Sequence, residues 1–122
     1  MIGKVTAISD RNFKQEVLES NVPVLVDFWA SWCPPCKMVE PTIRKLAQEL
    51  KGVVKIARIN VDQNSINASR YEITGVPTFI IFKKGEENAR CVGAQSMQQL
   101  LYMVESAGIK IKTFKAKKGG DR

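Results

Sequence analysis

The pattern of apolar and polar positions alternates between two kinds of segment along this chain. Continuous runs of β-branched and aromatic residues, such as Val-Leu-Val-Asp-Phe-Trp at 24–29, are typical of strands that are covered on both faces in a parallel sheet. A glycine-containing turn at 83–86 indicates a hairpin between the last two strands. The runs predict strands at 5–8, 24–29, 53–61, 78–82 and 89–92.

Between these strands, apolar residues recur at helical spacing. Four apolar residues from 39 to 50 are spaced 4, 3 and 4 positions apart, which predicts a helix that begins at or just after Cys33. Pro41 lies inside this helix, removes one backbone hydrogen bond and is expected to bend it. Asp10 is expected to cap an earlier helix and Ser96 the last one. A short helix is predicted at 65–71, and the inward residues of the other three are Phe13, Val17 and Leu18; Val39, Ile43, Leu46 and Leu50; and Leu100, Leu101 and Val104.

These elements follow one another in the order βαβαβαββα. We expect an α/β fold in which a central mixed five-stranded sheet is flanked by helices on both faces. At 122 residues, the chain is long enough for one domain whose core needs neither disulfides nor a metal to hold it together.

The formal net charge of +7 is concentrated at the C-terminal end. Residues 110–122 contain six Lys or Arg and one acidic residue, whereas residues 1–109 contain 13 basic and 11 acidic residues. The basic character is mostly a property of this end, so we expect no nucleic-acid binding by the domain. We predict a domain over 1–108 and a disordered basic tail over 109–122. The alternative is a tail that docks on an acidic partner or a membrane surface.

Targeting signals are not apparent in the sequence. No apolar run approaches the roughly 20 residues that cross a bilayer, and residues 1–7 lack the apolar region of a signal peptide. We therefore expect a cytoplasmic protein that does not enter a membrane.

Three cysteines and no histidine limit the chemistry that the chain can carry out. Cys33 and Cys36 are three positions apart, and Cys91 stands alone 55 positions later. A Cys-x-x-Cys pair is a redox dithiol, half of a zinc site, or two buried thiols that are close by chance. A four-cysteine zinc site needs a second pair, so we expect no metal. The position of the pair at a strand-to-helix junction favours the redox dithiol.

The start of a helix is a place where a thiol becomes reactive. The thiolate attacks disulfides, and a free cysteine is only about 3% ionised at pH 7. Unpaired backbone amides and the positive end of the helix dipole favour the anion. We therefore expect Cys33 to be the attacking thiolate and Cys36, one turn inside the helix and less exposed, to resolve the mixed disulfide within the same molecule.

Asp27 is unusual because it is a carboxylate inside an apolar strand. Its neighbours indicate that it faces the core, where burial raises a carboxyl pKa and suits it to accept a proton near neutral pH. Two interpretations are open: a hydrogen-bonded structural aspartate, or a general base that deprotonates Cys36. The cysteine pair on the next element favours the general base.

At this point the sequence resembles the thioredoxin family from about residue 5 to 107. Motif order and spacing agree throughout. The matching segments are Asp27-Phe28-Trp29-Ala30, Trp32-Cys33-x-Pro35-Cys36-Lys37, Pro41, Asn60-Val61-Asp62, Gly75-Val76-Pro77-Thr78, Gly85 and Gly93.

The resemblance implies a thioredoxin fold and a protein-disulfide reductase. It implies a cis Val76–Pro77 bond beside the cysteines, with the Val76 backbone pairing with a substrate strand. It also implies that Lys37 and Arg58 modulate the site, Arg58 as a cation near Asp27. A redox-active Cys33–Cys36 disulfide then takes the place of a cofactor, and the partners are disulfide-containing proteins and a flavin-dependent thioredoxin reductase, with the chain a monomer. The expected substrate-binding residues are Trp29, Trp32, Pro34, Pro35, Val76, Pro77, Gly93 and Ala94.

Pro34 departs from the family pattern, which has glycine between the first cysteine and Pro35. Proline removes an amide that could have faced the thiolate, so the reactivity of Cys33 and the redox potential cannot be carried over from the family. A proline directly after the first cysteine is also common in glutaredoxins. Glutaredoxins, however, are generally shorter and lack the opening strand and helix, the Trp-Ala-x-Trp segment and the buried aspartate, so we expect no dependence on glutathione.

Cys91 falls in the last predicted strand and is interpreted as a small buried hydrophobe, with a regulatory thiol as the alternative. Two other functions compete with the reductase. One is a scaffold or chaperone in which the cysteines are secondary; the other is a dedicated oxidant or isomerase, which the buried aspartate and the missing signal peptide disfavour.

Overall fold

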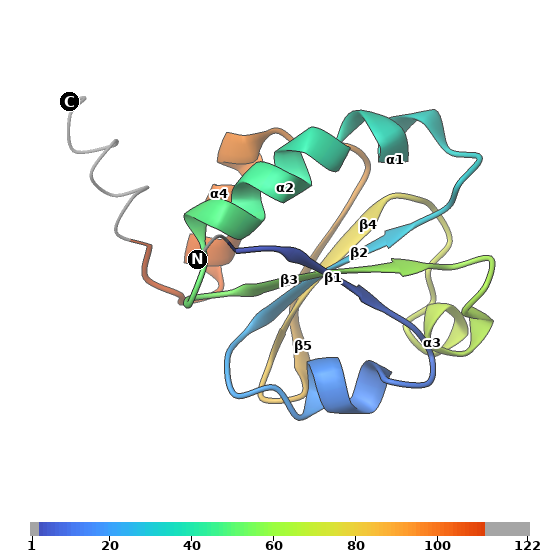
Figure 1. Ribbon diagram of the computed structural model, residues 1–122, viewed down its shortest axis with the longest axis horizontal. Coiled ribbons are helices and arrows are strands. Elements are labelled where there is room, and N and C mark those ends of the chain that lie inside the picture. The colour runs from blue at the N-terminus through green and yellow to red at the C-terminus, as the bar shows by residue number, and fades with distance from the viewer. Residues whose placement is uncertain (1–2, 112–122) are drawn as a thin grey trace.

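Five strands run side by side in the order β1-β3-β2-β4-β5 at the centre of the computed structural model, which describes residues 3–111 (Figure 1). The strands β1, β3 and β2 are parallel, and β4 and β5 are antiparallel to their neighbours. This arrangement confirms the predicted mixed sheet. The third strand is shorter than predicted and the fifth begins three residues earlier. The strands span Val5–Ile8 (β1), Val24–Trp29 (β2), Lys55–Asn60 (β3), Thr78–Lys83 (β4) and Glu86–Val92 (β5).

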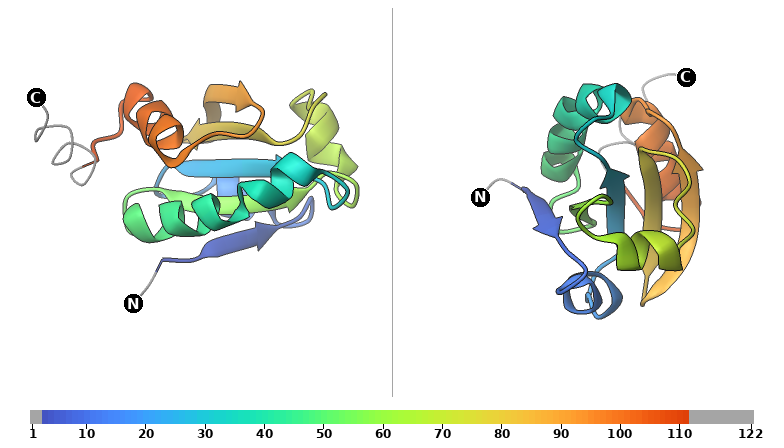
Figure 2. Two further views of the ribbon diagram at one scale, coloured as in Figure 1. Left: turned by 90° about the horizontal axis from the view of Figure 1, so that it is seen from above. Right: turned by 90° about the vertical axis from the view of Figure 1, so that its right-hand side faces the viewer.

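Helices cover both faces of the sheet, as predicted. One apolar cluster joins α2 and α4 to one face, and a second joins the segment around Phe13 and Val17 to the other. The two layers are visible in the views of Figure 2. The helices span Lys14–Leu18 (a short π-helical turn, η1), Pro34–Met38 (α1), Glu40–Glu49 (α2), Ser65–Arg70 (α3) and Met97–Ser106 (α4).

Pro41 divides the predicted long helix in two. The division falls at Val39, which ends α1 and precedes α2, and Pro41 lies in the first turn of α2. Because proline has no N–H, it cannot donate to the Lys37 carbonyl, and the Val39 amide donates to the Pro35 carbonyl at 3.2 Å. The expected bend is confirmed, two residues before the proline itself.

Asp10 caps a different helix from the one predicted. Its carboxylate accepts hydrogen bonds from the Ile66 and Asn67 amides at 3.0 and 2.9 Å, and from Asn67 Nδ2 at 2.7 Å. Asp10 therefore holds the start of α3, 56 positions later in the chain, rather than η1. The prediction was wrong because a carboxylate before an apolar run also reaches amides that only the tertiary fold brings near.

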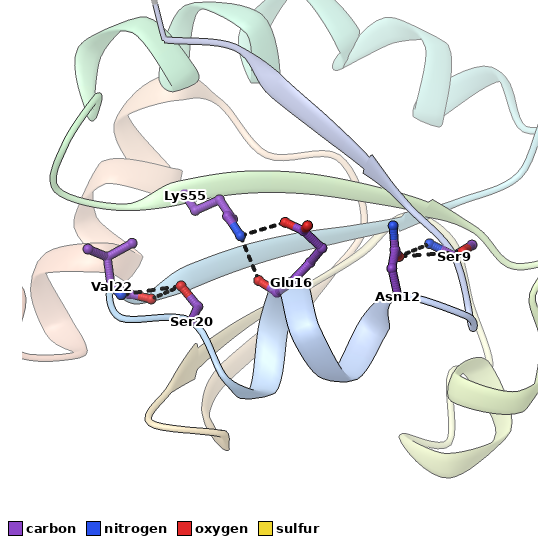
Figure 3. Close-up of polar contacts among 6 residues, drawn as sticks. All are labelled: Ser9, Asn12, Glu16, Ser20, Val22 and Lys55. Atoms are coloured by element: carbon purple, nitrogen blue, oxygen red, sulfur yellow. Dashed lines mark hydrogen bonds and ion pairs between the residues drawn. The ribbon is translucent and has the colours of Figure 1, made fainter.

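Other side chains hold η1 in place (Figure 3). Asn12 Oδ1 accepts from the Ser9 amide at 2.8 Å. Lys55 Nζ, on β3, donates to both Oε1 and the backbone oxygen of Glu16 at 2.8 Å. After η1, Ser20 Oγ donates to the Val22 carbonyl at 2.7 Å. The Lys55 contacts tie η1 to the sheet through β3, and the other two bonds fix the chain on either side of η1.

The C-terminal end of the described chain belongs to the core. Ile109 and Ile111 are 8% and 2% exposed and pack with the cluster between α2 and α4. The packed core therefore extends three residues beyond the boundary predicted at residue 108, because the burial of Ile109 and Ile111 depends on a surface that only the fold builds. The rest of that tail, 112–122, lies outside the described residues. Across residues 3–111, no helix is long and apolar enough to span a bilayer.

Candidate active site

The cysteine pair lies where the chain leaves β2 and enters α1. A disulfide joins Cys33 to Cys36. Cys33 is in an extended conformation at the N-cap of α1, and its Sγ accepts a hydrogen bond from the Cys36 amide at 3.2 Å. Pro34 and Pro35 occupy the first two helical positions and have no N–H to offer. One backbone amide of the first turn therefore contacts the Cys33 sulfur.

Both cysteines are enclosed in the oxidised protein. Cys36 is fully buried and Cys33 is 2% exposed, so the expected difference in exposure is small in this state. They form a small cluster with Ala30, against which Trp29, Val61 and Val76 pack. Sequence reasoning did not identify Ala30 and Val61 as part of the site. The signal that would have found Val61 is its place directly after β3, the strand beside β2.

A second segment approaches the disulfide from the start of β4. The Val76–Pro77 bond is cis, as the family resemblance implied. The Val76 carbonyl oxygen lies 3.6 Å from Cys33 Sγ. The Gly93 amide donates to the Pro77 carbonyl at 2.8 Å, which brings the end of β5 beside this turn, and Gly93 has a positive φ of +97° that favours glycine. Ala94 follows it.

Exposed apolar side chains lie next to the enclosed sulfurs. Trp32 is 66% exposed and Val92 is 60% exposed. A Cβ at Gly75 would lie 3.5 Å from Val92, so Val92 packs beside the turn that contains Val76. Val92 was not among the predicted site residues, although it directly precedes Gly93. Single exposed hydrophobes are ordinary, but two beside a reactive group provide a surface for an apolar partner.

Asp27 and Arg58 form a buried ion pair across β2 and β3. The two residues are opposite each other in the parallel register, and Arg58 Nε donates to Asp27 Oδ2 at 2.8 Å. Asp27 is fully buried, and its Oδ1 has no hydrogen-bond partner within residues 3–111. Burial raises the pKa of Asp27 to about 6, although the charge and hydrogen bond of Arg58 oppose this rise. Asp27 can thus exchange a proton near neutral pH.

Arg58 connects Asp27 to a second set of groups. Its guanidinium carbon lies 4.5 Å from the centre of the Trp29 ring, within the range of a cation–π contact. Its Nη1 lies 4.0 Å from Glu40 Oε2 on α2. The structure therefore brings Arg58 to Asp27, as expected, and adds Trp29 and Glu40 to the same arrangement.

Two further predicted residues, Lys37 and Cys91, do not belong to the cluster around the disulfide. Lys37 is exposed in the last turn of α1. Cys91 is half-buried on β5, and its Sγ lies 3.5 Å from Met103 Sδ beside the core. Burial raises the pKa of the Cys91 thiol, which disfavours its thiolate. Cys91 thus resembles a small apolar residue, as the sequence suggested, although it is only partly covered.

Comparison with known proteins finds one family model and several close relatives that match this chain. The Thioredoxin family model matches residues 4–106. A thioredoxin of Rickettsia felis is 49% identical over 94 residues, which cover 77% of this chain and 90% of the relative. Thioredoxin 1 of a Nostoc species is 51% identical over 87 residues, which cover 71% and 81%. A thioredoxin of Pyropia yezoensis is 47% identical over 90 residues, which cover 74% and 84%.

Proposed function

This chain belongs to the thioredoxin family and is a thiol-disulfide oxidoreductase, and from that premise we propose that it reduces disulfides in other proteins through Cys33 and Cys36. The observation that carries this proposal is the position of Cys33 at the N-cap of α1. There the Cys33 sulfur accepts a hydrogen bond from the Cys36 amide and lies close to the Val76 carbonyl oxygen.

The first step is attack by the reduced protein. The Cys33 thiolate attacks one sulfur of the substrate disulfide, forming a mixed disulfide and breaking the substrate bond. The departing substrate sulfur takes up a proton. Trp29, Trp32, Val76, Pro77, Gly93 and Ala94, with Pro34 and Pro35 at the turn, form the surface that receives the substrate, and the exposure of Trp32 and Val92 supports this assignment.

The second step releases the product. Cys36 loses its proton, attacks Cys33 Sγ and forms the Cys33–Cys36 disulfide, and the second substrate sulfur leaves as a thiolate. Two electrons pass from the dithiol to the substrate. Asp27 accepts the Cys36 proton, a role supported by its full burial and its raised pKa. Arg58 and Lys37 modulate this transfer by their positive charge, Arg58 directly through its contact with Asp27.

The cycle closes when a reductase returns the disulfide to the dithiol. The family indicates disulfide-containing substrates, and we propose that a thioredoxin reductase supplies the electrons, that the protein acts as a monomer in the cytoplasm, and that it needs no cofactor or metal beyond its own disulfide. Within residues 3–111, no three Cys, Asp or Glu side chains are grouped as metal ligands.

Substitution of each cysteine tests this proposal. Cys33→Ser is expected to abolish the reduction of insulin disulfides, because the attacking sulfur is lost. Cys36→Ser is expected to trap a covalent mixed disulfide on Cys33 that dithiothreitol releases. Cys91→Ser is the matched control and retains turnover. Insulin reduction by Cys33→Ser at the wild-type rate would refute the mechanism and favour the scaffold function.

A further inference from the structure

A cavity of about 500 Å³ lies between α2 and the parallel strands β1, β2 and β3. Trp29 lines it and also packs against the cluster of Cys33, Cys36 and Ala30. Among the described residues, Trp29 is the one residue of the proposed substrate surface that lines the cavity, whereas the others, such as Trp32 and Val76, do not. The cavity therefore adjoins the surface that receives protein substrates at Trp29 and is otherwise distinct from it.

The cavity occupies a place in the fold that favours small ligands. Ile8, Trp29 and Asn60, the last residues of the parallel strands β1, β2 and β3, all line it. In open α/β sheets, ligands bind in the crevice beyond the carboxyl ends of parallel strands. The opposite wall is α2, through Ile43 and Arg44. The volume is within the range that holds a small organic molecule.

Charged groups in the cavity favour an anion. Arg44 and Arg58 both line it, and Glu40 is the acidic residue beside them. Glu40 Oε2 lies 3.5 Å from Arg44 Nη2 and 4.0 Å from Arg58 Nη1. These separations are long for charge-assisted hydrogen bonds, so Glu40 holds neither guanidinium tightly.

Arg58 is the stronger of the two anchors. Its side chain is only 13% exposed, so water screens its charge less than it screens that of Arg44, which is 60% exposed. Its Nε donates to Asp27, its Nη1 makes only the 4.0 Å contact with Glu40 Oε2, and the residue lines the cavity. A carboxylate or phosphate there meets a guanidinium whose geometry suits two parallel hydrogen bonds.

Apolar side chains complete the walls. Val5, Ile8, Ile43 and the Trp29 ring line the cavity beside the arginines. A ligand with a charged head and a flat or aliphatic body would place its body against them, whereas inorganic phosphate would leave them uncovered. The combination therefore selects organic anions.

From this geometry we propose that the cavity binds a small organic anion whose carboxylate or phosphate displaces Glu40 from Arg44 and Arg58, and that the bound anion acts on Asp27 through Arg58. The bound anion can act on Asp27 because both interact with the positive charge of Arg58. The groups that face one another here are Asp27 on β2, Arg58 on β3, and Glu40 and Arg44 on α2. An added anion lowers the positive potential that Arg58 exerts on Asp27, so Asp27 then holds its proton to a higher pH.

Titration of the full-length oxidised protein tests the site. Phenyl phosphate and benzoate are followed by backbone amide and Trp29 indole shifts in NMR spectra at pH 7, with benzyl alcohol as the neutral analogue and inorganic phosphate as the head group alone. We expect saturable shifts at residues that line the cavity, such as Ser9 and Asn64, with tighter binding of the organic anions than of either control. Shifts that do not saturate, that map to Trp32 and Gly93, or that benzyl alcohol reproduces equally would overturn the proposal.

Three α2 variants separate charge from packing. Arg44→Gln is expected to weaken phenyl phosphate binding about threefold or more, and Glu40→Gln to tighten it by a similar factor, as expected for a partly exposed ion pair. Lys45→Gln is the matched control, because Lys45 is exposed on the same helix and outside the cavity. Equal affinities in all three variants would exclude an anion site.

The link to Asp27 has its own readout. With saturating phenyl phosphate, the pH midpoint of insulin reduction is expected to move upward, and Glu40→Gln to move it downward without ligand. A midpoint that stays fixed while phenyl phosphate saturates the cavity would refute the action on Asp27. Loss of activity in Cys33→Ser, by contrast, bears only on the proposed function.

Discussion

Asp27 gives the molecule a stability cost that depends on pH. Its pKa rises from 3.8 in the unfolded chain to about 6 in the folded protein. Between these pH values the folded state binds more protons than the unfolded state, so stability falls as the pH rises from about 4 to about 6 and then levels off. About two pKa units correspond to about 3 kcal/mol at pH 7.

Asp27→Asn is therefore expected to stabilise the protein at pH 7, by about 1–3 kcal/mol once the lost pairing of Arg58 is allowed for. The gain should shrink below pH 4, where Asp27 is protonated in both states. Urea denaturation at pH 3.5 and 7.5 measures the difference. A variant that is less stable than the wild type at pH 7.5 would show that the ion pair outweighs the burial of the carboxylate.

The same substitution is expected to slow turnover. If Asp27 accepts the Cys36 proton, the rate of the resolving step rises with pH through about 6 in the wild type, and the asparagine variant loses this rise and is slower by about tenfold or more at pH 7. Stopped-flow insulin reduction across pH 5–8 measures it. Asp62→Asn is the control, since Asp62 is exposed just after β3. An unchanged pH profile would remove Asp27 from the mechanism.

Pro34 is expected to matter less for the Cys33 sulfur than its chemistry suggests. The sulfur receives its hydrogen bond from Cys36, at the third helical position, whereas Pro34 is at the first, where an N–H rarely reaches the N-cap side chain. Pro34→Ala should shift the pH midpoint of Cys33 alkylation by less than about half a unit and lower stability by about 0.4–1 kcal/mol. A midpoint shift above about one unit would show that the missing amide does control the thiolate.

At the level of elements, the Asp10 cap of α3 couples two segments far apart in sequence. Burial raises the pKa of Asp10, but hydrogen bonds from Asn67 and Ile66 and the charge of Arg70 outweigh it, so the pKa lies below its ordinary value. The stability that Asp10 contributes is therefore present above its unfolded-state value of 3.8 and is lost as the pH falls through the folded-state value.

Asp10→Ala is expected to lower stability by about 0.5–2 kcal/mol at pH 7, the range for loss of a side chain that caps a helix N-terminus. Amide hydrogen exchange should increase at Ile66 and Asn67, whose N–H groups lose their acceptor. Arg11→Ala, at the exposed neighbouring position, is the control. Exchange that increases in η1 instead would mean that Asp10 stabilises the nearer segment.

The strands and helices could be predicted because each carries its own signal. The apolar run of β2 and the Ser96 cap of α4, confirmed by the hydrogen bonds between Ser96 and Gln99, depend on neighbouring residues only. The Asp10 cap could not be predicted, because it depends on where β1 ends and α3 begins in space. The same holds for Ile109 and Ile111, whose burial depends on a surface built from α2 and α4.

The residues of the candidate site also fall into those that local sequence predicts and those that only the fold brings together. Cys33, Cys36 and their place at the start of a helix follow from local sequence, and Asp27 follows from a carboxylate inside an apolar strand. The contacts of Glu40 with Arg58 and of the Val61 amide with the Trp29 carbonyl could not be predicted, because each joins elements that only the fold brings together. A single sequence does not reveal that register.

At the scale of the whole molecule, one edge of the sheet holds both the cysteine pair and the cavity. The parallel strands β1, β2 and β3 end at this edge, and β4 begins there because it runs in the opposite direction. Val76 thus meets Cys33 through the antiparallel pairing of β2 and β4, and Arg58 meets Asp27 through the parallel pairing of β2 and β3. The central position of β2 is what allows one strand to serve both contacts.

The residues that follow α4 extend this core, and their contribution can be measured. Ile111 is 2% exposed and packs with the cluster between α2 and α4, so Ile111→Ala in the full chain is expected to lower stability by about 2–3 kcal/mol through lost burial and a remaining cavity. Ile109→Ala should cost somewhat less, since Ile109 is 8% exposed. Lys110→Ala, at the exposed position between them, should stay within about 0.5 kcal/mol of the wild type. Urea denaturation of the oxidised proteins compares the three, and equal stabilities would return the domain boundary to residue 108.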